Sequence, residues 1–318
     1  MEQLKPIKLI PALKDYIWGG DELKKKFNIK SDMEKVAEAW ILSVHKDGNS
    51  KLENGEELSE YLKENPNAMG ENAQKFDRFP MLIKLIDAHK PLSVQVHPDD
   101  AYALSHEGEY GKTEMWYVAD CKEGAFLYFG LNQDLTKEEF KKKIEDNTIT
   151  EALNRVPVKK GDTFFISAGT LHAIGEGIVI CEIQQNSNTT YRVYDYDRRD
   201  KFGNPRELHI EKATETANLK KLEIPANNSR SDGFKRFSGY SETFLGGCKY
   251  FSAKLLEVDE WAELTAKDSF HHITVLENEC EITANNVSVT AKSGESIFVP
   301  SGLSYKINGK CTVICSYV

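Results

Sequence analysis

Short runs of β-branched and aromatic residues recur along the chain, and glycine or polar residues that favour turns separate them. Some runs alternate apolar and polar positions, as a half-buried strand does, whereas others are apolar throughout. The runs cover residues 79–88, 92–97, 114–119, 125–130, 163–167, 178–184 and 191–196, and then 250–258, 271–276, 280–284, 287–290, 296–300 and 312–318. Many short strands with glycine-rich turns predict a mainly β protein built of antiparallel sandwiches or barrels.

Helical periodicity is rare in this sequence. The clearest stretch is Thr136–Asp146, where Thr136 and Glu139 have the spacing of a capping box at a helix N-terminus. A shorter helix is expected to begin near Pro205, and a third is expected to span Glu57–Glu64. The helices are therefore predicted to be few and short.

An internal repeat divides the chain. Lys160–His172 matches Ser293–Tyr305: in both segments a glycine precedes an acidic residue and a strand, and a second glycine lies eight positions after the first. The sequence turns polar between residues 220 and 235. We therefore predict a first unit over residues 1–235, with helical insertions, and a second β unit over residues 236–318. The first copy ends in His172 and the second in Tyr305, a poor zinc ligand, so a metal is expected only in the first unit.

Composition narrows the classes of protein. The 318 residues carry a formal net charge of −9, which argues against a nucleic-acid partner. The first residues lack the organisation of a signal peptide, and no run approaches the ~20 apolar residues of a membrane span. The six cysteines are scattered, which predicts buried free thiols. We expect a cytoplasmic protein without a membrane partner, either a monomer or a homodimer.

One predicted strand carries polar residues along a single face. In the run 92–97, Ser93, Gln95 and His97 point to one side, and the apolar residues between them point to the other. Three such side chains in a row predict the wall of a polar pocket. Glu114 and His172 can complete a metal site there, because two imidazoles, a carboxylate and an amide oxygen suit zinc or a similar divalent ion.

Simpler interpretations exist for single residues. His97 alone is equally well explained as a hydrogen-bonded histidine inside a barrel, and Glu114 as an acid on a strand surface. The metal-site hypothesis rests on their combination. His271 and His272 are adjacent in a predicted strand, so their side chains face opposite sides and cannot chelate one ion together. We expect these two histidines at surface or edge positions.

The first copy of the repeat resembles the second motif of the cupin superfamily, Gly-x5-(Pro/Ser)-x-Gly-x2-His, which ends here at His172. The resemblance implies a mainly β fold of two cupin-like jelly-roll β units with a few short helices. The first cupin motif departs from the usual His-x-His, because Gln95 takes the place of the first histidine and Glu114 lies seventeen residues after His97. The intervening segment Asp99–Thr113 is expected to be a loop inserted over the pocket mouth.

Four segments together resemble the type I phosphomannose isomerase family in its short bacterial form, and the resemblance covers nearly the whole chain. They are Asp-Tyr-Ile-Trp-Gly-Gly at 15–20, His-Lys-Pro-Leu-Ser-Val-Gln-Val-His-Pro-Asp-Asp at 89–100, Gly-Lys-Thr-Glu-Met-Trp at 111–116 and Gln-Gln-Asn-Ser-Asn-Thr-Thr-Tyr-Arg-Val-Tyr-Asp at 184–195. The resemblance implies an aldose–ketose isomerase that interconverts mannose 6-phosphate and fructose 6-phosphate. It also implies one Zn²⁺ per chain, bound by Gln95, His97, Glu114 and His172.

The same resemblance places other site residues. Arg192 matches the family's catalytic arginine, and Lys112 and Ser93 match other polar groups of the active site. Asn188 stands where the family commonly has aspartate, which puts the role of that carboxylate in doubt. Proton transfer between C1 and C2 through an enediolate needs a polarised carbonyl, an acid–base residue and a grip on the phosphate. A nearby zinc charge would lower the pKa of Lys112 and suit it to proton transfer, whereas Arg192 suits either the phosphate or the developing oxyanion.

Two other functions compete with this hypothesis. Other metal-dependent cupin enzymes, such as dioxygenases and decarboxylases, prefer three imidazoles or an iron-type triad, which Gln95 in place of a histidine disfavours. A non-enzymatic cupin that binds sugar phosphates would not require Lys112 and Arg192 beside a full ligand set. The isomerase is therefore the favoured prediction.

Overall fold

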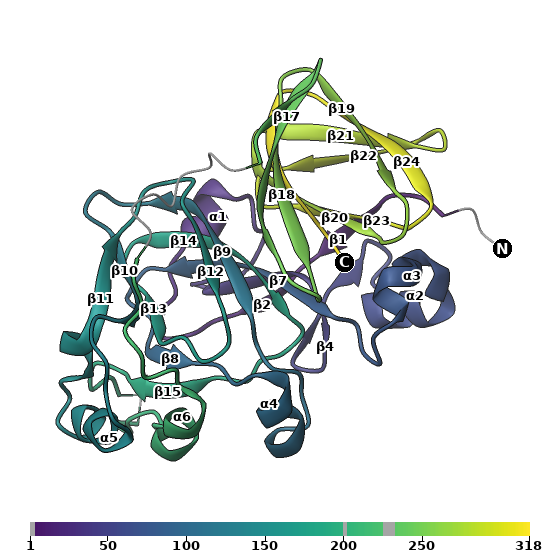
Figure 1. Ribbon diagram of the computed structural model, residues 1–318. Coiled ribbons are helices and arrows are strands. Elements are labelled where there is room, and N and C mark those ends of the chain that lie inside the picture. Colours follow the sequence, from purple (N-terminus) through teal and green to yellow (C-terminus); the bar gives the residue numbers. More distant parts are fainter. Residues whose placement is uncertain (1–3, 200–201, 225–232) are drawn as a thin grey trace.

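The computed structural model describes residues 4–199, 202–224 and 233–318, and it confirms the expected mainly β fold of two cupin-like units with a few short helices (Figure 1). The first unit is a barrel of two antiparallel sheets. One sheet has the order β12 (Thr163–Ile166), β9 (Glu114–Cys121), β14 (Ile178–Gln185), β7 (Met81–Ala88), β3 (Glu38–Leu42) and β2 (Ala12–Lys14). The other has the order β11 (Leu153–Pro157), β10 (Phe126–Leu131), β13 (His172–Ile174), β8 (Val94–Val96) and β15 (Tyr191–Tyr194).

The second unit is a smaller barrel, also of two antiparallel sheets. Its larger sheet has the order β16 (Lys235–Arg236), β17 (Tyr240–Gly247), β18 (Ser252–Val258), β25 (Cys311–Tyr317), β20 (His271–Glu277), β23 (Ser296–Val299), β1 (Ile7–Ile10) and β6 (Lys51–Leu52). Its smaller sheet has the order β19 (Trp261–Ala266), β24 (Leu303–Asn308), β21 (Glu279–Ala284) and β22 (Val287–Lys292). β4 (Val44–His45) and β5 (Gly48–Asn49) form a separate two-stranded sheet, a hairpin that is not hydrogen-bonded into the sheets of either barrel.

The larger sheet of the second unit also holds two strands from the start of the chain. β1 pairs antiparallel with β23, with Leu9 opposite Ser296, and β6 pairs with β1. The two units are thus joined by backbone hydrogen bonds as well as by the chain between them. The polar junction predicted near residue 235 falls partly on residues 225–232, which lie outside the described residues.

The helices lie around the barrels and are short. They are α1 (Glu22–Lys26), α2 (Leu58–Glu64), α3 (Gly70–Gln74), α4 (Asp100–His106), α5 (Lys137–Glu145) and α6 (Ile210–Thr216), with 3-10 turns at Pro66–Met69 and Ile149–Ala152. The capping box that Thr136 and Glu139 predicted is present at the start of α5. α2 matches its expected range, whereas α6 begins later than expected. No helix of the described residues is long and apolar enough to cross a membrane.

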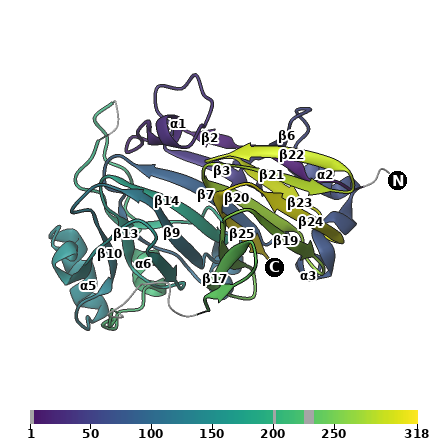
Figure 2. The same ribbon diagram turned by 90° about the horizontal axis from the view of Figure 1, so that it is seen from above.

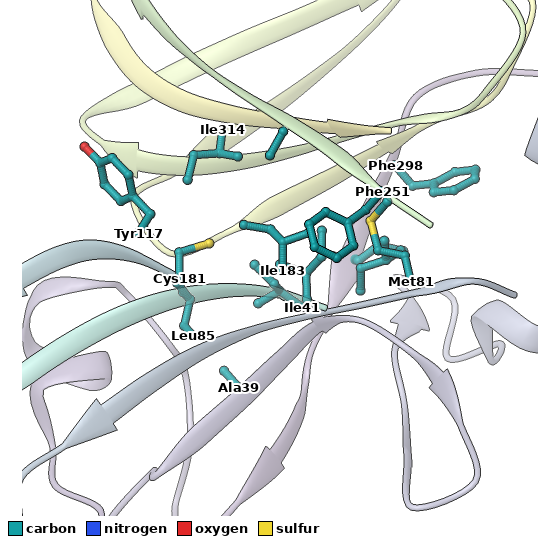
Figure 3. Close-up of a cluster of buried hydrophobic side chains, with 14 of the residues drawn as sticks. Ala39, Ile41, Met81, Leu85, Tyr117, Cys181, Ile183, Phe251, Phe298 and Ile314 are labelled. Atoms are coloured by element: carbon teal, nitrogen blue, oxygen red, sulfur yellow. The ribbon is translucent and has the colours of Figure 1, made fainter. Parts of the chain in front are cut away.

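A shared hydrophobic core joins the two units, which lie against each other in both views (Figures 1 and 2). Figure 3 shows this core, in which Ile183 and Leu85 of the first unit face Phe251, Phe298 and Ile314 of the second. Because one face of the six-stranded sheet packs on the second unit and the other faces the first barrel's interior, every residue of β7 and β14 is buried. This double burial explains why these strands are almost continuously apolar in sequence.

Two expectations about local structure are wrong. His271 and His272 are not at the surface, since they are only 8% and 0% exposed. Each lies on a strand whose two faces are both covered, one by the second barrel's interior and the other by the first unit. The segment Asp99–Thr113 is not simply a loop, because it contains α4, whose N-terminus is capped by the side chain of Asp99.

Candidate active site

Three buried side chains meet inside the first unit. Glu114 is the first residue of β9 in the six-stranded sheet, and His172 is the first residue of β13 in the five-stranded sheet. His97 follows the end of β8. All three are at most 1% exposed, and one potential ligand atom of each lies within 4.8 Å of the other two. Because both sheets contribute, closure of the barrel brings the three residues together.

Backbone carbonyls fix the tautomers of both histidines. Nδ1 of His97 donates to the carbonyl of Thr189 at 2.9 Å, and Nδ1 of His172 donates to the carbonyl of Thr170 at 2.8 Å. Each Nε2 is then free of its proton and faces Glu114, at 3.6 Å for His97 and 3.3 Å for His172. Burial lowers the pKa of both imidazoles, to about 4 for His172. Both rings are therefore neutral at neutral pH, as metal ligation requires.

The unpaired atoms of this group suit a cation. Nε2 of His97 and Oε1 of Glu114 are buried and have no hydrogen-bond partner among the described residues. Buried polar atoms rarely stay without a partner, and a bound ion is one explanation. The amide nitrogen of Gln95 lies 3.3 Å from Nε2 of His172, and a half-turn of that amide presents its oxygen in the same place. Two imidazoles, a carboxylate and an amide fit zinc or a similar divalent ion.

A chain of buried charges continues from Glu114 along the barrel interior. Nζ of Lys112 lies 2.9 Å from Glu114 and 3.8 Å from Glu182, and Nζ of Lys84 lies 3.6 Å from both Glu182 and Glu38. Charged side chains are seldom buried unless they are paired. Two lysines and three carboxylates that alternate in this way therefore form a mutually dependent network.

Burial and neighbouring charges set the pKa values in this network. Burial, with the adjacent Glu182, raises the pKa of Glu114. Burial opposes ionisation of Glu182 as well, but Lys112 and Lys84 outweigh it and lower its pKa. Burial lowers the pKa of Lys112, but Glu114 and Glu182 raise it by more. The sequence prediction concerned Lys112 beside a zinc ion, and it stays a prediction; the charges of the chain itself raise the pKa of Lys112.

A cavity of about 280 Å³ opens next to these residues. Ser93, Gln95, Lys112, Asn188 and Arg192, all singled out from the sequence, line it. The three buried residues of the metal-ligand group adjoin the cavity through the contacts of Gln95 and Lys112 described above. The structure thus brings all eight of the residues singled out from the sequence to one place, while their roles stay predictions.

Two arginines line the cavity, and one of them, Arg192, is paired with Gln95 across β15 and β8. Nη1 of Arg192 donates to the carbonyl of Glu207 at 2.9 Å, and its buried Nε has no hydrogen-bond partner among the described residues. Arg206 also lines the cavity, and its guanidinium is held by the carboxylate of Asp195, which binds Arg198 too. Three arginines around one carboxylate leave an excess of positive charge, which suits an anionic ligand.

Several cavity residues were not predicted. Lys84 and Glu182 are charges in the middle of predicted strands whose other residues are mostly apolar, and this pattern could have revealed them. Arg206 lies outside the helices and strands, where no periodicity marks it. His209 belongs to no motif, yet its Nδ1 accepts a hydrogen bond from the backbone N–H of Arg192 at 3.1 Å. Only the folded chain shows that His209 supports Arg192.

Known proteins resemble this chain over its full length. The family described as phosphomannose isomerase type I, catalytic domain, matches residues 7–124, and the mannose-6-phosphate isomerase cupin domain matches residues 240–318. A mannose-6-phosphate isomerase of Bacillus subtilis is 38% identical over 99% of both chains. A mannose-6-phosphate isomerase of Streptococcus mutans is 36% identical over 98% of both chains.

Solved structures agree with these sequence matches. The crystal structure of the mannose 6-phosphate isomerase from Bacillus subtilis has a TM-score of 0.91 and 35% identity, and the match covers 99% of this chain and 100% of that one. The enzyme of Salmonella typhimurium, at 18% identity and a TM-score of 0.76, shares the fold. The resemblance found in the four sequence segments is therefore confirmed, and this chain is an enzyme of the type I phosphomannose isomerase family.

Proposed function

We propose that this chain interconverts mannose 6-phosphate and fructose 6-phosphate with the help of one Zn²⁺. The observation that carries the proposal is the buried group of His97, Glu114 and His172, with both Nε2 atoms unprotonated, next to a cavity that Arg192 and Arg206 also line. A cation site and an anion site on one cavity match a sugar phosphate that reacts at one end and is held at the other. The names of the full-length relatives support this substrate.

Gln95, His97, Glu114 and His172 would hold the ion. Bound there, Zn²⁺ supplies a Lewis acid that stabilises negative charge on the oxygens at C1 and C2. The carbonyls of Thr189 and Thr170 keep the two imidazoles in the required tautomer and orientation.

Lys112 is the proposed acid–base residue. Its ammonium group lies on the cavity wall and contacts Glu114, so it is placed beside the reacting end of the sugar. A lysine at this place can give a proton to an oxygen of the enediolate and take one back as the carbonyl re-forms. Glu182 and Lys84 would hold the charge balance around this lysine while the proton moves.

The arginines are the proposed phosphate site. Asp195 holds the guanidinium of Arg206 in one orientation, and Arg192 is fixed through Glu207. The unpaired Nε of Arg192 and the fork of Arg206 together offer donors to phosphate oxygens. Ser93 and Asn188, which also line the cavity, would bind hydroxyls of the sugar. Because Arg192 is also paired with the proposed ligand Gln95 across β15 and β8, the developing oxyanion is a second candidate partner for it.

A coupled assay of fructose 6-phosphate formation from mannose 6-phosphate tests the proposal. We expect the purified protein to turn over, to lose activity after chelation and to regain it when zinc is restored. Absence of turnover in the zinc-loaded protein, with sugar-phosphate binding intact, would instead favour a binding protein. Turnover only with another metal or another substrate would favour a different cupin enzyme.

The proposal extends to the division of the chain into two units, to its location and to its oligomeric state. Residues 1–235 would form the catalytic metal-binding unit, and residues 236–318 a unit without a metal site. The six cysteines, all within the described part of the chain, are free thiols, which suits a reducing cytoplasm. Light scattering of the purified protein distinguishes a monomer from a homodimer.

A further inference from the structure

We infer that Glu109 is a positioning residue for the metal ligand His97, and that it acts through the backbone of the loop 186–190. The inference rests on the proposed metal binding. Glu109 lies in the segment that follows α4 and does not touch His97, and it was not among the residues singled out from the sequence. Two contacts connect the side chains of Glu109 and His97 through the loop, and a third fixes Glu109 itself.

The first contact is between His97 and the loop. Nδ1 of His97 donates to the carbonyl of Thr189 at 2.9 Å, and no other hydrogen bond holds the imidazole among the described residues. The position of that carbonyl therefore decides where Nε2 points. Hydrogen bonds of this kind orient metal-binding histidines and fix their tautomer.

The second contact is between the loop and Glu109. Oε2 of Glu109 accepts the backbone N–H of Asn188 at 3.2 Å and lies 3.5 Å from Oγ1 of Thr189. These two groups belong to Thr189, whose carbonyl binds His97, and to the residue before it. Burial raises the pKa of Glu109, but Lys46 and the N–H of Asn188 lower it by more, so the carboxylate is charged at neutral pH. A charged acceptor makes a stronger hydrogen bond than a neutral one.

The third contact fixes Glu109 itself. Its Oε1 lies 2.9 Å from Nζ of Lys46 and 3.4 Å from Nε2 of His45, both on the hairpin of β4 and β5. The same hairpin reaches the loop directly, because Oδ2 of Asp47 accepts the side-chain amide of Asn188 at 3.0 Å. Two carboxylates thus converge on residue 188. An aspartate at 188 could not donate to Asp47 as the amide of Asn188 does.

Zinc affinity is the decisive measurement, made by competition with a chelator on the purified full-length protein. We expect Glu109→Ala to weaken zinc binding by about 10- to 100-fold, the range typical of groups that orient a ligand. With saturating zinc, kcat should fall while KM for mannose 6-phosphate stays near that of the wild type. A merely structural role would lower the thermal stability of the metal-free protein without a selective loss of zinc affinity.

Two further variants keep the test decisive. Lys46→Met removes one of the groups that fix Glu109 but leaves its hydrogen bonds to the loop, so it should weaken zinc binding less than Glu109→Ala does. Glu109→Gln keeps the side-chain volume and serves if Glu109→Ala does not fold; its zinc affinity should still fall by about 10-fold. Wild-type affinity in both Glu109 variants would overturn the inference alone. A wild-type protein that binds no zinc would overturn the proposed function as well.

Discussion

The second barrel repeats the first strand by strand, yet its interior carries different side chains. β20 pairs with β23 as β9 pairs with β12, and the matched glycines of the repeat align β23 with β12. His271 therefore takes the place of Glu114, and Tyr305 that of His172. In the second barrel these two bind each other, with 2.7 Å between Nδ1 of His271 and Oη of Tyr305. His271 and Tyr305 thus use each other as hydrogen-bond partners. Glu114 and His172 of the first barrel instead present atoms that could bind a cation.

The other two ligand positions have lost their donor atoms. Leu264 pairs with Tyr305 as Gln95 pairs with His172, so Leu264 replaces Gln95, and Ala266, two residues on, replaces His97. Side chains of leucine and alanine cannot bind a metal. The comparison shows that this barrel forms with or without a ligand set, so the ligands are not what holds it together.

One charged pair is common to both barrels. Registers through β18 and β25 place Lys254 where the first barrel has Lys84, and Glu242 where it has Glu38. The lysine–glutamate distance is 3.6 Å in the first barrel and 3.1 Å in the second. However, Cys315 replaces Glu182, so the second barrel lacks the carboxylate that bridges two lysines. The lysine–glutamate pair is part of the fold that both barrels share, whereas the bridging carboxylate of Glu182 occurs only beside the candidate active site.

The largest expected effect comes from removing the second barrel. A chain that ends at residue 235 leaves β1 without β23 and uncovers the apolar face of β7 and β14. We expect a protein that is insoluble or unfolded, which soluble yield and circular dichroism would measure. A soluble, fully active fragment would contradict the view that the second barrel is a packing partner of the first.

Transplanting the second barrel's residue into the first tests the ligand comparison. His172→Tyr should abolish zinc binding and lower kcat/KM at least ~10³-fold, since a catalytic metal ion supplies several kcal/mol. Isothermal titration with zinc and the coupled assay measure both effects. The reciprocal Tyr305→His is the control and should keep wild-type turnover. Equal losses of zinc binding and turnover in the two variants would mean that both barrels contribute to the active site.

Substitutions of the matched lysines, Lys84 and Lys254, test which lysine–glutamate pair matters for the candidate active site and which only for the fold. Lys84→Met leaves two buried carboxylates short of a partner and should cost about 3–5 kcal/mol of unfolding free energy. Lys254→Met should cost at most about 1 kcal/mol, because Glu242 is more exposed and keeps Lys235 nearby. Urea unfolding measures this difference. Only the first substitution should also reduce turnover, by about 10²-fold; similar results for both lysines would refute the distinction.

Acid should act on the second barrel through His271. Burial and Lys254 lower its pKa to about 3, so the folded protein holds it neutral while the unfolded chain protonates it near pH 6.5. The unfolded state then binds more protons below pH 6.5, and acid favours unfolding. Between pH 6.5 and 5 this histidine should account for about 2 kcal/mol of lost stability. In urea unfolding, His271→Gln should lose less unfolding free energy on acidification than the wild type does. An identical loss would show that His271 does not contribute to the acid sensitivity.

Sequence patterns predicted the fold class and the ligand group because both leave local marks. Strands such as 178–184 show in their apolar runs, and the repeat that ends in His172 and Tyr305 reveals two related barrels. β8 and β12 were predicted although they have only three and four residues, whereas β1 to β6, of two to five residues, were not. Their structure comes from pairing with distant segments.

The finer chemistry of the site was beyond local patterns. The pKa of Lys112 is raised by Glu114, two residues on, and also by Glu182, which is seventy residues away in the chain but 3.8 Å away in the fold. The burial of His271 and His272 depends on the packing of the two units, which no alternation within one strand encodes. Such properties arise from tertiary contacts between segments that are far apart in the sequence.

The pairing of β1 with β23 also bears on how the protein is made. β1 leaves the ribosome among the first residues, but β23 is synthesised nearly a whole chain length later. At typical elongation rates this delay is on the order of 15–60 s. During that time the nascent first barrel carries an unpaired strand and an uncovered apolar face, which is when aggregation competes with folding. A partner for β1 and cover for this apolar face thus arrive only with the second barrel, and chaperone capacity should limit the yield of this enzyme at high expression.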